Sequence, residues 1–287
     1  MDSNSPRLPE KRKALNEKTE KLTELKNAVT TLAETFNRIN IDSERIRAAR
    51  EYFENCKFKE ADAILKTEDI DNEVTNLKAK KVWLDKEIKE TESQLSERAQ
   101  EYVLKAKLRV TFVEDKDRFK KAEELFEKAL DISRNAETIF DYAYYLQGQN
   151  QYRQSIELYT EALAIYQKLS QTNPAVYEPY VATTLNNLAN LHADTGLYSE
   201  AEKEYTEALE LYRKLSQTNP AVYESNVAIT LHNRAILYGI TKRYSEAMQN
   251  CTEALELYRK LAKANPDVYE SDLADTMKVM ELLNKLQ

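Results

Sequence analysis

Apolar residues near the start of the chain recur at alternating spacings of three and four residues, the pattern of a helix with a single apolar seam. This pattern predicts a helix over residues 15–40. Such a seam is typical of a helix that packs lengthwise against another helix. Its members are Leu22, Leu25, Val29, Leu32, Phe36 and Ile39.

A second long helix is predicted over residues 70–110, where a similar stripe is interrupted by Lys81, Thr91 and Arg98. Because isolated helices are marginal in water, this helix needs a partner. The partner is either the first helix folding back or the same helix of a second chain. The apolar members of the stripe are Val74, Leu77, Leu84, Ile88, Leu95 and Tyr102.

Two short antiparallel helices are predicted between the long ones, over residues 43–66, as part of a helical region spanning 11–110. This hairpin is either a degenerate copy of the repeats that follow or an unrelated helical hairpin. Residues 1–10 contain Ser and two Pro without periodicity, so we expect them to be disordered.

Repeated segments begin at residues 119, 152, 198 and 244, so the intervals are 33, 46 and 46 residues. They read "FKKAEELFEKAL", "YRQSIELYTEAL", "YSEAEKEYTEAL" and "YSEAMQNCTEAL", and each follows another helix with small and apolar residues on one face. Units of two helices that bury their apolar faces only against neighbouring units form an α-solenoid. The sequence therefore predicts an all-α solenoid over 111–270 and a C-terminal capping helix over 271–287.

The middle repeat carries small and large residues at matched positions, among them Leu185, Leu188, Ala189, Tyr198 and Ala201. In this pattern the chain resembles the tetratricopeptide repeat (TPR) proteins. The 46-residue period with "TLNNLANLH" at its centre is similar to the extended kinesin-light-chain style of repeat, which also occurs in bacterial proteins. The resemblance implies a right-handed solenoid of TPR helix pairs.

The recurring "LSQTNPAVYE" is interpreted as a joint between repeats, because Pro cannot continue a helix and the residue before Pro avoids the α region. We expect the next helix to start five residues after this Pro, at Pro179, Ser225 and Ser271.

The composition is typical of a soluble helical protein, since 32% of the residues are charged and only three are Gly. The net charge is −7; residues 1–110 carry 23 basic and 22 acidic side chains, and residues 111–287 carry 19 and 27. Neither part predicts a nucleic-acid surface. Because the sequence has no long apolar run, we expect neither a membrane-spanning helix nor a secretory signal. We expect a cytoplasmic location. Two distant cysteines, Cys56 and Cys251, indicate no disulfide framework.

No arrangement of residues predicts catalysis, so we expect no enzyme and no cofactor. His192 and His232 have no Cys or carboxylate at metal-binding spacing, and the three Gly lie too far apart for a phosphate loop.

The candidate binding residues lie on the first helices of the repeats, whose inner faces line the concave groove in the family that the chain resembles. Asn side chains both donate and accept, so a row of them can bind the main chain of an extended peptide, as the resemblance implies. The alternative is that Asn186, Asn187 and Asn233 tie neighbouring helices together. Phe140 and Tyr144 are expected to form an apolar anchor site. The predicted face comprises Phe140, Asp141, Tyr144, Gln147, Asn186, Asn187, Asn190, Asp194, His232, Asn233 and Ile236.

The favoured function is a non-enzymatic scaffold that binds a peptide or helix of a partner protein in this groove. Two alternatives stay open: a dimerising coiled-coil rod, and a sensing or regulatory arm of a bacterial signalling or defence complex. Homo-oligomerisation through the N-terminal helices is compatible with all of these.

Overall fold

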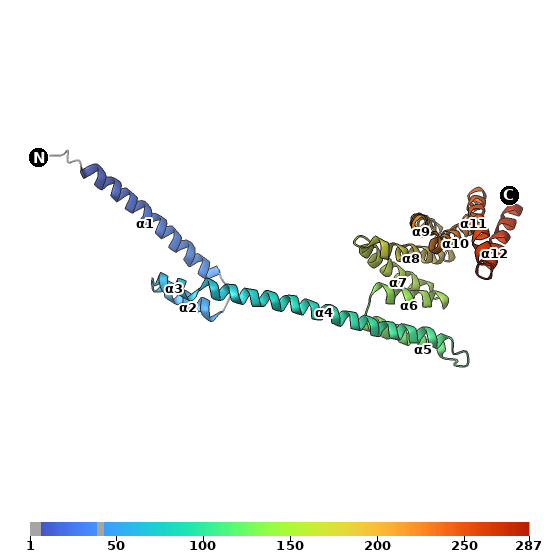
Figure 1. Cartoon of the computed structure of the whole chain (residues 1–287), viewed down its shortest axis with the longest axis horizontal. Coiled ribbons are helices and arrows are strands. Elements are labelled where there is room, and N and C mark those ends of the chain that lie inside the picture. Colours follow the sequence, from blue (N-terminus) through green and yellow to red (C-terminus); the bar gives the residue numbers. More distant parts are fainter. Residues whose placement is uncertain (1–6, 39–42, 287) are drawn as a thin grey trace. The chain divides into compact units, whose positions relative to one another are not determined.

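A computed structural model describes residues 7–38 and 43–286, and it divides the chain into two compact units, residues 1–87 and 88–287 (Figure 1). The expectation of disorder for residues 1–6 lies outside the described residues. Residues 7–10 are helical, because the first helix already starts at Arg7. The helices that begin in the first unit are α1 (Arg7–Arg38), α2 (Glu44–Glu54), α3 (Phe58–Ile64) and α4 (Thr67–Val110).

The α2–α3 hairpin forms the small core of the first unit. Ser43 caps α2 by accepting a hydrogen bond from the backbone N–H of Ile46 at 3.2 Å. The turn after α2 places Cys56 in the left-handed region, with φ of 56°. Phe53 then packs against Phe36 at the end of α1, with ring centroids 5.1 Å apart. The hairpin thereby holds the C-terminal end of α1.

Most of the predicted seam of α1 lies at the surface. Leu22, Leu25 and Leu32 are 53%, 57% and 44% exposed. The stripe on α4 is exposed too, with Leu77 65% and Ile88 55% exposed. Within the first unit, therefore, α1 leaves Leu77 of α4 uncovered, and its own seam is open as well.

The second unit is a stack of helix pairs, and its first pair uses the end of α4. Ala99, Val103 and Ala106 of α4 are buried against Phe126 and its neighbours in α5. Further pairs follow along the chain, and α12 packs on the last of them (Figure 1). The helices are α5 (Arg118–Ile132), α6 (Ala136–Gly148), α7 (Tyr152–Ser170), α8 (Pro174–Asp194), α9 (Tyr198–Thr218), α10 (Pro220–Ile240), α11 (Tyr244–Ala264) and α12 (Pro266–Leu286).

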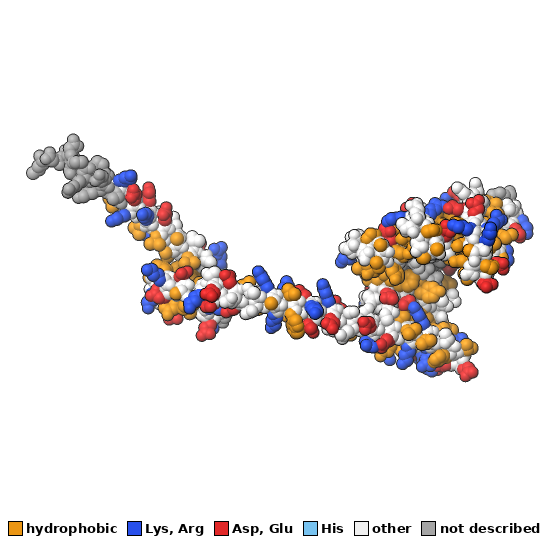
Figure 2. Space-filling model, in the orientation of Figure 1, with side chains coloured by type: hydrophobic (Ala, Val, Ile, Leu, Met, Phe, Trp, Pro, Cys, Tyr) orange, Lys and Arg blue, Asp and Glu red, His pale blue; other side chains and the backbone are white. Residues whose placement is uncertain are grey.

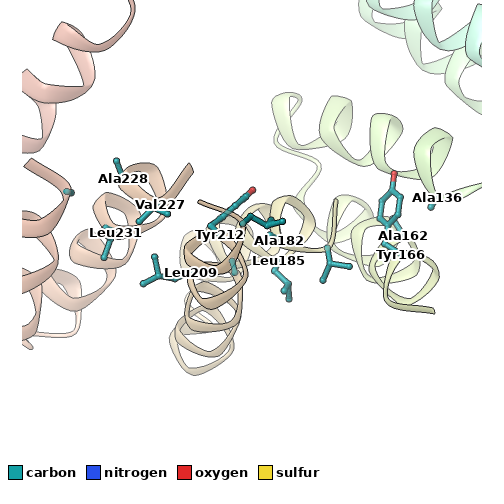
Figure 3. Close-up of a cluster of buried hydrophobic side chains, with 14 of the residues drawn as sticks. Ala136, Ala162, Tyr166, Ala182, Leu185, Leu209, Tyr212, Val227, Ala228 and Leu231 are labelled. Atoms are coloured by element: carbon teal, nitrogen blue, oxygen red, sulfur yellow. The ribbon is translucent and has the colours of Figure 1, made fainter. Parts of the chain in front are cut away.

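A continuous apolar cluster runs through the stack (Figure 3). Ala162, Ala208 and Ala254 recur at the 46-residue period and are fully buried, because only a small side chain fits where two helices cross closely. Leu185 and Leu231 fill the space between them. The described residues contain no strand, and the predicted all-α solenoid of helix pairs is confirmed.

The predicted starts of the first helices are wrong. α8, α10 and α12 begin at Pro174, Pro220 and Pro266, so the capping helix starts five residues before 271, and Pro179 lies inside α8. Proline is favoured at the first position of a helix, where its missing N–H would have no partner. The Asn-Pro pair therefore ends one helix and starts the next, with Asn219 alone between α9 and α10.

None of the helices described is both long enough and apolar enough to cross a membrane.

Candidate functional site

The first helices of the pairs carry a hollow of about 670 Å³ on the second unit, lined mostly by apolar groups. Its walls come from α4, α5, α6 and α8. The lining residues are Lys107, Val110, Phe126, Phe140, Asp141, Tyr144, Tyr145, Gly148, Gln149, Thr183 and Asn187. Four predicted residues, Phe140, Asp141, Tyr144 and Asn187, thus meet in one place.

Two aromatic side chains give this hollow its apolar character. Phe140 is half-buried and packs edge-on against Tyr159, with ring centroids 5.2 Å apart. Tyr144, one turn further along α6, is 61% exposed. Phe140 is thus fixed by packing, whereas the ring of Tyr144 is available to a ligand.

Lys107 supplies a cation that the predicted site did not include. Its Nζ donates to Asp141 Oδ1 at 2.7 Å, and the Lys107 side chain is 50% exposed while that of Asp141 is 17% exposed. The sequence held a signal for it, because Lys107 precedes Asp141 by about one 33-residue repeat interval. The last turns of α4 act as the first helix of a pair, in agreement with the sequence pattern, in which the segment at residue 119 also follows another helix.

A second hollow of about 330 Å³ lies further along the same row of helices. It is lined by Gln147, Asn190, Ala193, Asp194, Tyr205, Asn233, Ile236, Leu237 and Ile240. Five more predicted residues therefore come together here. Ile236 is 37% exposed and provides an accessible apolar contact.

Two networks of tyrosine and amide groups connect the first helices. Tyr159 donates to Gln147 Oε1 at 3.1 Å and accepts from Asn187 Nδ2 at 3.1 Å. In the next repeat, Asn190 Oδ1 accepts from Tyr205 at 2.5 Å and from Asn233 Nδ2 at 3.1 Å. The amides therefore tie helices together, as the alternative interpretation held, and also face the hollows.

Each network leaves hydrogen-bonding groups unused among the described residues. The amide nitrogens of Gln147 and Asn190 and the amide oxygens of Asn187 and Asn233 have no partner there. An asparagine or glutamine side chain offers both donors and acceptors, so these groups can bind a peptide main chain. Burial raises the pKa of Tyr159 and of Tyr205, so both hydroxyls stay protonated at neutral pH.

Asn186 and His232 occupy the same position in successive repeats, and neither lines a hollow. Asn186 is only 9% exposed, and Thr230 donates to its Oδ1 at 3.2 Å. His232 Nδ1 lies 2.8 Å from the hydroxyl of Thr276. Both side chains thus bond to a buried threonine of the following first helix. Each lies one residue before a side chain that lines a hollow, so it points to a different side of the helix, into the stack.

The site offers apolar burial and hydrogen bonds, and no grouping suited to covalent or metal chemistry stands out in it. Among the residues described, no three His, Cys, Asp or Glu side chains gather as a metal site. His192 bonds to Glu204 at 2.7 Å, and burial raises the pKa of Glu204, but this pair lines neither hollow.

Solved structures with a similar arrangement of helices include the apo form of RapI, with a TM-score of 0.54 and 18% identity over 96% of this chain and 71% of that one. At this identity the likeness is one of fold. BtubC (BKLC) from P. vanneervenii has a TM-score of 0.47 and 22% identity over 68% of this chain and 84% of its own. A Podosopora anserina putative kinesin light chain with nearly identical TPR-like repeats has a TM-score of 0.41 and 16% identity, over 68% and 94%. No curated protein matches the chain.

Family profiles agree with the helix pairs. Two profiles described as Tetratricopeptide repeat match residues 143–174 and 180–260, which lie within α6 to α11. The repeats seen in the sequence, the stacked helix pairs and these two matches agree, and the matched stretches, residues 143–174 and 180–260, are tetratricopeptide repeats.

Proposed function

We propose that this protein acts as a non-enzymatic scaffold that binds an extended segment of a partner protein along its first helices. The large hollow beside Tyr144 carries this proposal, because an exposed aromatic side chain next to an apolar cavity is a typical anchor site. An apolar side chain of the partner would fill it. The unused amide groups of Gln147 and Asn190 would then bind the partner's main chain.

The charges at the hollow favour one kind of anchor. Lys107 is half exposed, whereas its partner Asp141 is largely covered, so an approaching ligand meets the cation first. An acidic group next to the apolar anchor would share this cation. A partner segment with an apolar residue flanked by Asp or Glu fits best.

The test uses two exposed residues, one from each hollow, so that the fold is spared. Proteins retained from source-cell lysate by the full chain would be identified, and synthetic peptides tiling each one titrated against purified chain. We expect Tyr144→Ala and Ile236→Ser each to weaken binding of the same peptide by at least about tenfold, equivalent to about 1.4 kcal/mol. Tyr198→Ala is the matched control, because Tyr198 is 38% exposed and lines neither hollow.

The decisive comparison is between the groove variants and the control. Equal loss of affinity in all three variants, or none in any, would place the binding surface elsewhere and contradict the proposal. Far-ultraviolet circular dichroism of each variant checks that the helices persist.

A further inference from the structure

The exposed apolar side chains of α1 form a row along one face of the helix. Leu15, Leu22, Leu25 and Leu32 are between 44% and 64% exposed. Figure 2 shows apolar surface on α1 and α4 between charged side chains. Contiguous apolar surface on a soluble helix marks a packing face that still needs a partner.

α4 carries a matching row. Val74, Leu77, Leu84, Ile88 and Leu95 lie on the same three- and four-residue spacing, with Lys81 and Thr91 at two positions between them, and these five apolar side chains are between 40% and 65% exposed. Both rows extend over roughly the same length, since residues 15–32 and 74–95 span about 26 and 32 Å at 1.5 Å per residue. Each row could therefore cover the other along most of its length.

The charges beside the two rows are complementary. In a coiled coil, the residues flanking the seam determine which helices pair. On α1 the charged flanking residues described are Lys21 and Lys26, which are both exposed. On α4 the flanking positions hold two bases, Lys78 and Lys80, and five acids, Asp71, Glu73, Asp85, Glu87 and Glu92, of which Glu73 pairs with Arg45 of the same chain. Pairing α1 with α4 brings Lys21 and Lys26 towards acids such as Asp71, Asp85 and Glu92, whereas pairing two α1 helices brings these lysines together.

Within the first unit, one end of α1 is fixed at the hairpin. The C-terminal end of α1 is held by the hairpin, through the Phe36–Phe53 contact and a hydrogen bond from Arg50 to the carbonyl oxygen of Phe36. In this unit the row on α1 is exposed, and so are Val74, Leu77 and Leu84 of α4. We propose that the occupant is a second copy: α1 of each chain packs on α4 of the other, and the exchange closes a symmetric dimer.

The first test is the mass of the full chain in solution. Sedimentation equilibrium over a concentration series should give twice the chain mass of 33.3 kDa. Leu22→Asp with Leu25→Asp on α1, and separately Leu77→Asp on α4, should give the mass of one chain, because each puts a charge in the seam. A wild-type chain that stays monomeric at every concentration would overturn the proposal in favour of an α1 that folds back or stays free.

The second test distinguishes α1–α4 pairing from pairing of identical helices. K21E with K26E should weaken the dimer by about tenfold or more, because lysines that face the acids of α4 become acids themselves. D71K with D85K in the same chain should restore part of the lost affinity, because Asp71 and Asp85 lie on one edge of the α4 row and can face only one of the two substituted positions. Lys13→Glu with Arg38→Glu is the control, since it changes the net charge equally on the other faces of α1.

A dimer unaffected by K21E with K26E would contradict this pairing, as would one to which D71K with D85K restores no affinity. All of these positions lie outside both hollows, so the result is independent of the peptide-binding proposal.

Discussion

Buried threonines recur at 46-residue intervals in the first helices, and their partners explain which predicted residues line the hollows and which pack inside the stack. Thr138, Thr184, Thr230 and Thr276 are all fully buried. Asn186 and His232 face two of them across the boundary between repeats. Changing either residue would therefore loosen the stack before it altered any groove.

His232 gives the last repeat a dependence on pH. Burial lowers its pKa below the ordinary 6.5, and the nearby carboxylates of Asp272 and Asp275 offset this only in part. In the unfolded chain the imidazole is protonated as pH falls through 6.5, whereas in the folded chain it stays neutral to lower pH. The unfolded state then binds more protons, so stability is lost as pH falls from 6.5 towards the folded-state pKa.

His232→Asn should remove this loss, because an asparagine can face Thr276 as Asn186 faces Thr230. Urea unfolding between about pH 8 and about pH 5 gives the free energy of unfolding of each protein. In the difference between the two free energies, titrations common to both proteins cancel. An unchanged difference across that range would mean that the folded chain protonates His232 as readily as the unfolded one does.

The resemblance to tetratricopeptide repeats predicted which side of each first helix turns inward, but only to within a turn. Tyr144 and Ile236, both carried over in this way, line the two hollows. Neighbouring helix positions differ by 100° around the axis. Whether Asn186 or Asn187 faces outward depends on a threonine 44 residues away, which no local pattern reveals.

The turns within the helix pairs share one backbone conformation at the scale of the element. Asn150, Gly196 and Lys242 occupy the same position in three repeats, and their φ angles are 58°, 81° and 62°. Glycine adopts this left-handed conformation freely, asparagine tolerates it, and lysine is strained in it. Only the Gly196 turn could be anticipated from residue type.

Lys242→Gly should raise the free energy of unfolding by about 0.5–1 kcal/mol, because relief of the strained φ outweighs the larger entropy of glycine in the unfolded chain. Thermal unfolding measures this gain. Lys242→Ala removes the same side chain but keeps a Cβ at positive φ, so it should show no gain. Stabilisation by both variants would point to the lysine side chain instead of the backbone.

The joints show where local rules were misleading. Asn-Pro was correctly interpreted as the end of a second helix, but proline also starts helices well. Because the pair does both, the first helices are five residues longer than predicted, and Pro179 falls in the second turn of α8. There it removes one backbone hydrogen bond near the helix start, where few are made.

For the whole molecule, a stack of repeats is only as stable at its ends as its last interface allows. α12 provides that interface at the C-terminus. Leu283 is 3% exposed and packs with Ala235, Tyr238 and Cys251, while the outer side of α12 is open, with Met277 44% exposed. The two cysteines of the chain differ accordingly: Cys56 is exposed, and Cys251 is buried beneath α12.

Because of this burial, the labelling rate of the Cys251 thiol reports how often the C-terminal helix detaches. Burial raises the pKa of its thiol to about 11, so a thiol reagent reacts at once with Cys56 and with Cys251 only when α12 lifts off. Leu283→Ala should speed labelling of Cys251 at least tenfold, since such truncations cost about 2–5 kcal/mol. Labelling of Cys56 in the same sample should keep its rate, and mass spectrometry of the two peptides reads both. An unchanged labelling rate at Cys251 would mean that exposure of its thiol does not depend on the packing of α12.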